Sequence, residues 1–266
     1  MLEVEFAQLS DTGKVREHNE DYLGHVLPAT PALAQSHGWL FALADGVGGQ
    51  QKGEVASHAA VECMLAGFRA SAGGEPHSAL LRRLVQAANT KVYESGIAAG
   101  SGGGAMATTV VACALRYDRA AVAHVGDSRC YLIRQGHLTA LTRDHTVTNE
   151  QVRLGLISTR EAADAETRHL LSRSLGNDLF VAVDTSEHQV FADDVLLLCS
   201  DGLHGAVPEA DIRHSVGHGV DLHAAARKLI EVANHRDGSD NVSVLLIRVL
   251  GVERVGMYRG RPYKLR

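Results

Sequence analysis

The 266-residue sequence predicts an α+β protein, in which helices and antiparallel strands build a single domain. Two long segments, residues 53–69 and 79–97, repeat apolar side chains at close to helical spacing, as Val55, Ala59 and Cys63 do in the first. Four short apolar runs then follow one another within residues 107–142, and they read ATTVVACAL, AAVAHV, SRCYLIR and HLTALT. Consecutive short strands joined by turns are typical of antiparallel sheet.

The other segments complete this order of elements. Gln135-Gly136 supplies a tight turn between the last two apolar runs. Residues 146–176 are polar and helical, with few large apolar side chains, which indicates an excursion over the surface. Further strands follow, then a helix opened by Pro208, a helix near residues 221–234 and a final strand. The sequence contains no internal repeat, and its 45% hydrophobic content is enough for a sizeable core.

Composition argues against several kinds of partner and location. The formal charge of -5 and the pI near 6.3 argue against a nucleic-acid binder, which needs a basic face to neutralise phosphates. The four cysteines lie far apart with no Cys-x-x-Cys pair, as expected for reduced core residues of a cytosolic protein. The first residues are acidic, and no run reaches the roughly 18 apolar residues of a membrane span. We therefore expect a cytoplasmic protein with neither nucleic-acid nor membrane partners.

Four aspartates stand at the ends of strand-like runs, beside glycine or a small polar residue. They are Asp45 after WLFALA, Asp127 after AAVAHV, Asp201 after VLLLCS and Asp240 before VSVLLIRV. Buried strands normally end in neutral turn residues, because an unpaired buried carboxylate is costly. Four carboxylates at such ends indicate that divalent metal ions gather them.

Glycine-rich and histidine-rich segments offer alternative sites that the sequence favours less. Residues 100–104 lack the Lys-Ser/Thr pair of a phosphate-binding loop, so we expect a flexible surface loop there. Gly46-Val47-Gly48-Gly49 has Gln51 where a dinucleotide fingerprint needs its third glycine, and Asp45 would repel a pyrophosphate. His214 and His218 are one helical turn apart, a spacing more typical of a solvated helix face than of ligands.

The carboxylate oxygens of these aspartates limit which metal ions can bind and which reaction the ions can support. Carboxylate oxygens suit Mg²⁺ or Mn²⁺, whereas a zinc site would recruit cysteine or clustered histidine. A pair of such ions lowers the pKa of a bridging water and directs the water in line at a phosphorus atom. The sequence thus predicts hydrolysis of a phosphate ester.

Several motifs in a fixed order resemble one family. The segments are VREHNED, FALADGVGGQ, TTVVACAL, VGDSRCYLIRQGHL, LLSRSLG, LLLCSDGLHG and GSDNVSVLLI. Together they resemble the metal-dependent serine/threonine protein phosphatases of the PPM (protein phosphatase 2C) type, most of all the compact bacterial members. The resemblance covers residues 4–250. It implies a four-layer α-β-β-α sandwich of two antiparallel sheets and a phosphatase domain over residues 1–250 with a flap at 146–176. The residues beyond the final strand, 251–266, form a basic tail.

The resemblance assigns catalytic metal-binding roles to three aspartates and one glycine. Asp45 would bridge two catalytic Mn²⁺ or Mg²⁺ ions, and the backbone carbonyl of Gly46 would bind one of them. Asp201 and Asp240 would hold the other. Asp127 resembles the ligand of a weaker third ion, shared with Asp201.

Two acidic residues and one arginine complete the implied site. Glu20 and Asp21 would act through metal-bound waters or by orienting ligands. Arg16 occupies the place of the arginine that grips the substrate phosphate with two parallel hydrogen bonds. Each residue also has a simpler interpretation: Asp-Gly and Asp-Asn pairs are commonly turns, and Arg16 could be a surface residue paired with Glu17 or Glu20.

The implied function is the hydrolysis of phosphoserine and phosphothreonine in proteins by a metal-activated water, opposing a bacterial serine/threonine kinase. Two alternatives remain at this point, a silent phosphatase-like binding module and a hydrolase of small phosphoesters. Eukaryotic relatives often have a histidine after the Asp-Gly pair, proposed as the general acid, but Val47 stands there, and Gln50 replaces another family histidine. The sequence names no general acid, although His18 has a suitable unperturbed pKa. The basic residues after position 250 are expected to form a disordered, solvated end more readily than a docking element.

Overall fold

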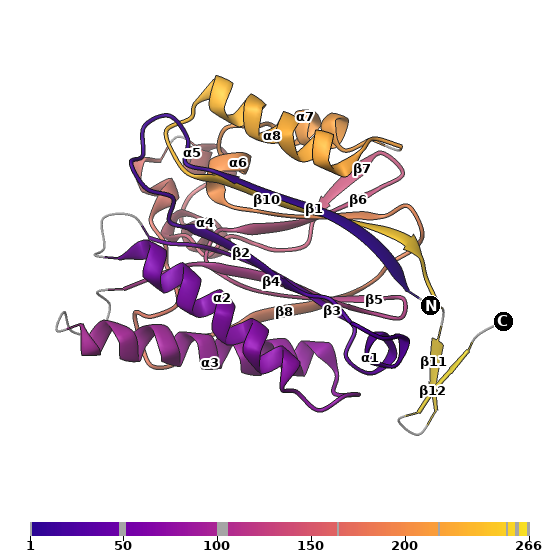
Figure 1. Ribbon diagram of the computed structural model, residues 1–266. Coiled ribbons are helices and arrows are strands. Elements are labelled where there is room, and N and C mark those ends of the chain that lie inside the picture. The colour runs from indigo at the N-terminus through magenta and orange to yellow at the C-terminus, as the bar shows by residue number, and fades with distance from the viewer. Residues whose placement is uncertain are drawn as a thin grey trace.

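Two antiparallel sheets pack face to face with helices on both outer faces, as the sequence predicted (Figure 1). The computed structural model describes residues 2–47, 52–99, 106–163, 165–217, 219–253, 255–258 and 261–264. The glycine-rich residues 100–104, together with Gly48, Gly49, Gln50 and His218, lie outside these described residues. None of the described helices is long and apolar enough to cross a membrane.

Each sheet contains five strands. The first sheet has the order β1 (Glu3–Asp11), β10 (Val242–Gly251), β9 (Val195–Cys199), β6 (Arg129–Arg134) and β7 (His137–Ala140). The second has the order β2 (Asp21–Val26), β3 (Trp39–Asp45), β4 (Val110–Arg116), β5 (Arg119–Val125) and β8 (Asp184–Gln189). The predicted turn between β6 and β7 is present: Gln135 and Gly136 have φ values of 49° and 75°, which match a tight hairpin turn.

Helices cover the outer face of each sheet (Figure 1). The helices α2 (Gly53–Arg69) and α3 (His77–Ala98) lie on the second sheet, while α6 (Asp201–His204), α7 (Glu209–Ser215) and α8 (Leu222–Arg236) lie on the first. A short α1 (Pro31–Ser36) links β2 to β3. The surface excursion contains α4 (Val147–Arg153), α5 (Thr159–Ala163) and the 3-10 helix η1 (Glu166–His169). Pro208 directly precedes α7, and the side chain of Asp221 caps α8 by accepting a 2.7 Å hydrogen bond from Ala224 N.

The alternation of side chains along the strands places the core in three layers. In β3, Leu40 and Ala42 face the helices α2 and α3, whereas Phe41 and Leu43 face the other sheet. In β9, Leu197 packs toward α8 on the opposite outer face. Because such strands are covered on both faces, their sequences are continuous apolar runs rather than alternating ones.

The end of the chain differs from the expectation of a disordered tail. The strands β11 (Val255–Tyr258) and β12 (Arg261–Lys264) pair with each other in an antiparallel hairpin and join neither large sheet. Figure 1 shows this hairpin apart from the sandwich. The β-branched and aromatic residues Val255, Tyr258 and Tyr263 favour extended backbone, which the count of basic residues did not reveal.

Candidate active site

The four strand-end aspartates gather at one end of the sandwich. Asp45 ends β3, Asp127 follows β5, Asp201 begins α6 directly after β9, and Asp240 precedes β10. All four line one cavity of about 460 Å³. Both sheets contribute, so residues far apart in the sequence meet where the strands of the two sheets end.

Most of the residues assigned from the sequence line this cavity. They are Arg16, Glu20, Asp45, Gly46, Asp127, Asp201 and Asp240. Asp21 lies behind them, buried at 8% exposure. It lies directly opposite Asp45 in the antiparallel pair of β2 and β3. This position suits a residue that orients the lining carboxylates rather than one that faces the cavity.

Gly46 must be a glycine because the backbone of two other segments surrounds it. Its N–H donates to the Glu20 carbonyl at 3.0 Å. A Cβ atom at this position would collide with the carbonyl group of Gly53 and lie 2.9 Å from the Glu20 carbonyl oxygen. The close approach brings the segment that carries Glu20 against the end of β3, next to Asp45.

Burial, together with the crowding of carboxyl groups, raises the pKa values of the aspartates in this cavity. Burial raises the pKa of Asp45 well above its usual range, and the neighbouring Asp21, Asp201, Asp127 and Asp240 raise it further. Burial together with the charge of Asp201 raises the pKa of Asp127 to about 8. The pKa of Asp201 is raised by burial and by Asp240. Among the described residues that line the cavity, Arg16 is the only arginine or lysine that faces these acids.

Asp21 has an unused hydrogen-bond acceptor in this cluster. Its Oδ2 atom accepts a 2.8 Å hydrogen bond from Ser200 Oγ, but its buried Oδ1 atom has no partner among the described residues. Burial is the main cause that raises the pKa of Asp21 to about 7, against the effect of its hydrogen bonds with Ser243 and Ser200. An unpaired buried carboxylate oxygen within a group of hard oxygen donors fits a hydrated Mn²⁺ or Mg²⁺ ion.

Arg16 stands at the mouth of the cavity. Its Nη2 atom donates to Asp240 Oδ2 at 2.9 Å, so its partner is a candidate metal ligand rather than Glu17 or Glu20. The loop that carries it is held by Lys14 N, which donates to the Gly238 carbonyl at 2.7 Å. With 41% of its side chain exposed, the guanidinium group can turn toward an incoming phosphate.

Several residues that the sequence analysis did not single out hold the site in shape. The side-chain amide of Asn241 donates to the carbonyls of Thr12 and His18, and its Oδ1 atom accepts from Glu20 N at 2.8 Å. Thr109 Oγ1 accepts from Asp45 N at 3.1 Å. Asn241 and Thr109 lie inside the motifs GSDNVSVLLI and TTVVACAL. This position within a family motif was the only sign in the sequence that they belong to the site.

The surface excursion supplies one wall of the cavity. The lining residues from this part of the chain and the turn after it are His169, Leu170, Leu171, Ser174 and Asn177. No spacing in the sequence connects them to the aspartates, because their position depends on how the excursion folds back over the strand ends. His18, in contrast, is not among the described residues that line the cavity.

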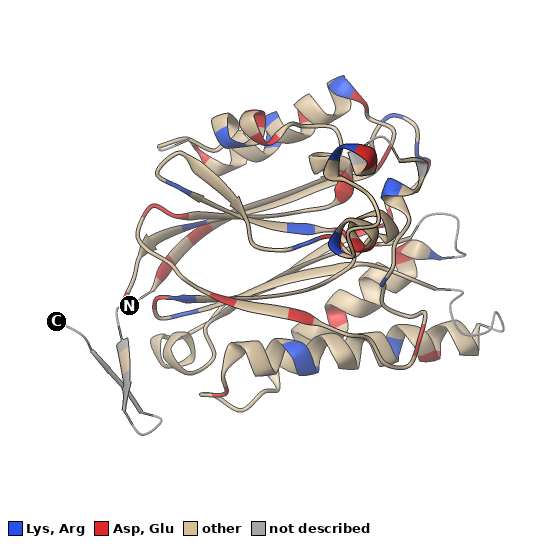
Figure 2. Cartoon of the chain, turned by 180° about the vertical axis from the view of Figure 1, so that it is seen from behind, with Lys and Arg blue, Asp and Glu red and all other residues tan. Residues whose placement is uncertain are grey.

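Charged residues elsewhere are mixed in sign. Figure 2, which views the chain from behind, shows basic and acidic positions interspersed on helices, strands and loops. Mixed charge of this kind is the pattern of an ordinary solvated surface.

Known proteins resemble this chain over nearly its whole length. A family model described as protein phosphatase 2C matches residues 14–241. The serine/threonine phosphatase Stp of Listeria welshimeri is 34% identical over 255 residues, which cover 95% of this chain and 96% of that protein. The protein phosphatase PhpP of Streptococcus pneumoniae is 29% identical over 247 residues, covering 92% and 97%.

Solved structures agree in fold. The serine/threonine phosphatase of S. agalactiae superposes with a TM-score of 0.83 at 32% identity, covering 93% of this chain and 100% of that chain. The catalytic domain of the phosphatase PstP, in complex with two manganese ions, has a TM-score of 0.79 at 33% identity, covering 94% and 100%.

The two-sheet sandwich is the fold that this chain shares with these phosphatase structures, one of which holds two manganese ions. The chain belongs to the protein phosphatase 2C family. The fold class and the family resemblance inferred from the sequence are therefore confirmed.

Proposed function

We propose that this protein is a Mn²⁺- or Mg²⁺-dependent protein serine/threonine phosphatase. The observation that carries the proposal is the convergence of Asp45, Asp127, Asp201 and Asp240 on one cavity that also contains Arg16. The family membership and the phosphatase names of its relatives support the same function. We also propose a cytoplasmic location and a bacterial serine/threonine kinase as the opposing enzyme.

The lining residues divide into ligands and orienting groups. Asp45 would bridge two ions, with the Gly46 carbonyl on one and Asp201 and Asp240 on the other. Asp127 and Asp201 would share a weaker third ion. When bound, these ions would supply an activated water for in-line attack and would neutralise charge on the phosphate.

The remaining work falls to side chains of the protein itself. Glu20 and Asp21 would accept hydrogen bonds from water molecules around the ions, because Glu20 lines the cavity and one buried oxygen of Asp21 has no partner in the described part of the chain. Arg16 would exchange its contact with Asp240 for the substrate phosphate and hold it by two parallel hydrogen bonds. Val47 also lines the cavity and cannot transfer a proton to the leaving alkoxide.

The test is phosphate release from a phosphothreonine peptide by metal-stripped protein, with Mn²⁺, Mg²⁺, Zn²⁺ or Ca²⁺ added back separately. Restoration by Mn²⁺ or Mg²⁺ is the expected result, and silence of folded protein with every metal would favour a phosphatase-like binding module. A second comparison uses kcat/KM for the peptide and for an aryl phosphate. Cleavage of the peptide no better than the aryl phosphate would favour a hydrolase of small phosphoesters.

A further inference from the structure

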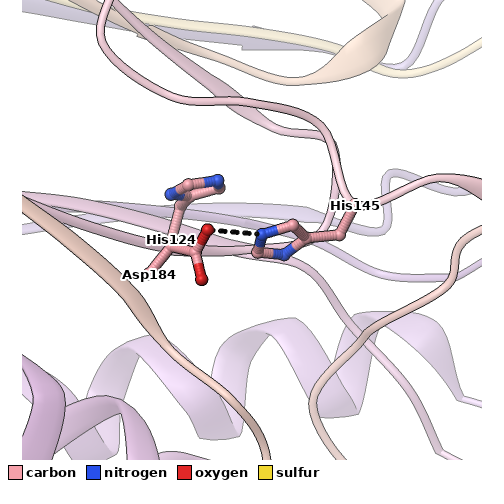
Figure 3. A group of neighbouring side chains, drawn as sticks. All are labelled: His124, His145 and Asp184. Atoms are coloured by element: carbon pink, nitrogen blue, oxygen red, sulfur yellow. Dashed lines mark ion pairs between the residues drawn. The ribbon is translucent and has the colours of Figure 1, made fainter. Parts of the chain in front are cut away.

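A cluster of polar side chains lies at the root of the surface excursion, and its members are not among the described residues that line the cavity. Its centre is formed by His124 on β5, His145 just before α4, and Asp184 at the start of β8. Figure 3 shows the ring of His145 directed toward the Asp184 carboxylate, with the His124 ring beside them. Both histidines are buried, at 5% and 2% exposure.

His145 holds Gly126 through both polar groups of that glycine's backbone. The backbone N–H of His145 donates to the Gly126 carbonyl at 2.9 Å, and the Gly126 N–H donates to His145 Nδ1 at 3.2 Å. Gly126 immediately precedes Asp127 and has a φ of 107°, a conformation that few other residues adopt. The contact with His145 therefore determines the direction in which the chain enters Asp127.

The second ring nitrogen of His145 fixes the ring in this orientation. Because Nδ1 accepts a hydrogen bond, Nε2 carries the proton and donates to Asp184 Oδ2, 3.2 Å away. Arg173 holds the carboxylate from its other side through a 3.1 Å contact with Oδ1, and it also reaches Glu150 on α4 at 3.3 Å. The excursion is thus fastened at its beginning by Glu150 and at its end by Arg173.

His124 supports the ring of His145 from one face. The two rings are stacked at 4.6 Å between centroids with an angle of 20° between their planes. The Nε2 atom of His124 lies 2.8 Å from the Arg143 carbonyl, to which it donates. Burial lowers the pKa of both histidines, which disfavours a positive charge on either of the stacked rings.

The loop around Asp127 is also tied to the segments of the other aspartates. His204, on the helix that Asp201 begins, donates from Nε2 to the Asp127 carbonyl at 3.0 Å. Ser128 lies 2.7 Å from Thr109, whose hydroxyl accepts from Asp45 N. Of these ties, only the one through His145 connects the Asp127 loop to the excursion.

The same side chains have the composition of a zinc site, but their hydrogen bonds favour a different role. The ring nitrogen of His145 that would have to bind an ion is Nε2. This nitrogen already carries a proton, through which it donates a hydrogen bond to Asp184. The guanidinium group of Arg173 lies 3.3 Å from that nitrogen and 3.1 Å from Asp184, so a cation of the protein fills the place of an ion.

We propose that His145 is a positioning residue for Asp127. His145 orients the Gly126–Asp127 backbone and thereby couples the excursion to the weak metal position shared by Asp127 and Asp201. This proposal rests on the proposed function, since Asp127 is a metal ligand only within it. It assigns a role to a histidine that lies outside the metal-binding motifs.

Two amide substitutions separate the two hydrogen bonds made by the ring of His145, one with Gly126 and one with Asp184. Asparagine places an oxygen near the position of Nδ1, so His145→Asn keeps an acceptor for the Gly126 N–H and loses the contact with Asp184. Glutamine places its amide near the position of Nε2, so His145→Gln keeps a donor for Asp184 and loses the acceptor for Gly126. His137→Gln, at an exposed position on β7, serves as a matched control.

The measurement is Mn²⁺ binding to the folded full-length protein by titration calorimetry, together with the Mn²⁺ dependence of peptide hydrolysis. We expect His145→Gln to weaken the weakest class of Mn²⁺ site by about 10-fold, as loss of an orienting contact commonly does. The tighter sites should be unchanged, and His145→Asn and His137→Gln should bind like the wild type. Equal Mn²⁺ binding by the glutamine variant and the wild type would overturn the proposal.

Further outcomes decide the remaining cases. If the glutamine variant does not fold, His145→Ala removes the acceptor for the Gly126 N–H without adding bulk at the buried position, and unchanged weak-site binding by the folded alanine variant would again overturn the proposal. A different result would replace the positioning role with a zinc site at the cluster of His124, His145 and Asp184. That result is Zn²⁺ binding by the Asp45→Asn variant that is lost when His124→Gln is added. Absence of Mn²⁺ binding in the wild type would mean that the proposed function has failed, whereas failure limited to the variants concerns His145 alone.

Discussion

Asp21 and Asp45 lie directly opposite each other at the ends of β2 and β3, although 24 positions separate them in the sequence. One is buried behind the cavity and the other lines it. Two carboxyl groups at such close quarters repel each other when both are ionised, so the charge of Asp21 adds to the effect of burial in raising the pKa of Asp45. The folded chain thus contains a centre of negative charge that a divalent cation relieves.

Replacing Asp45, the carboxylate that we propose bridges the two ions, should separate activity from folding. Asp45→Asn keeps the volume of the side chain but removes its charge, so we expect kcat/KM on a phosphothreonine peptide to fall by more than about 100-fold. The thermal midpoint of the metal-free protein should stay the same or rise, because a repelled carboxylate is lost. Asp193→Asn, at an exposed turn, is the matched control. Near-normal turnover of Asp45→Asn would remove Asp45 from the metal site.

The stability of metal-free protein should decrease as the pH rises. The pKa of Asp21 is raised to about 7, above the value of about 4 for an unfolded carboxyl group, so the folded state retains a proton that the unfolded chain releases. This contribution is fully present below about pH 4 and is lost as the pH rises through about 7.

Urea unfolding in EDTA at pH 5 and pH 8 measures this contribution. Asp21→Asn should show a smaller decrease between the two pH values than the wild type, and saturating Mn²⁺ should reduce the decrease in the wild type. The same decrease in wild type and variant would show that Asp21 titrates normally in the folded protein.

Removing the arginine at the cavity mouth should act on phosphate binding. We expect Arg16→Ala to raise KM for a phosphopeptide by about 10- to 100-fold, the loss of charge-assisted hydrogen bonds worth about 1.5–3 kcal/mol. Arg16→Lys should recover part of the loss, because a lysine keeps the charge without the planar fork. Steady-state kinetics at saturating Mn²⁺ provides the measurement. Unchanged KM and kcat in the alanine variant would mean that Arg16 does not touch the substrate.

A methyl group at Gly46 should disrupt the site through the backbone. The Cβ atom of Gly46→Ala would meet the carbonyls of Gly53 and Glu20, so the segments around Asp45 must move apart. We expect loss of activity together with a lower thermal midpoint. Gly217→Ala is the control, because its Cβ atom would lie 3.8 Å from its nearest neighbours, and surface changes of this kind alter stability by about 0.5 kcal/mol or less. Equal behaviour of the two variants would argue against close packing at Gly46.

The sequence was most informative where chemistry and local backbone preference coincide. Asp45, Asp127, Asp201 and Asp240 could be recognised because strand-like runs end at or beside them, and these ends meet in the folded protein. The hairpin turn at Gln135-Gly136 and the helix following Pro208 were predictable for the same reason, since residue type and backbone conformation are directly linked there.

The sequence was least informative where a contact joins distant segments. The pairing of Arg16 with Asp240 spans 224 positions, and the ties of Asn241 to Thr12 and His18 span 229 and 223. The paired strands at the C-terminus also differed from expectation, because a count of charges does not register the extended preference of the residues among them.

The sequence by itself determined which chemical groups this protein offers: hard oxygen donors at strand ends, an arginine that we propose binds phosphate, and the order of motifs that identifies its family. Only the tertiary structure decided which carboxylate faces the cavity and which lies behind it, and that the surface excursion forms one wall. It also decided that His145 holds the backbone before Asp127. The physical reason is that residue type fixes what a side chain can bind, whereas the packing of the two sheets fixes which groups come within reach of one another.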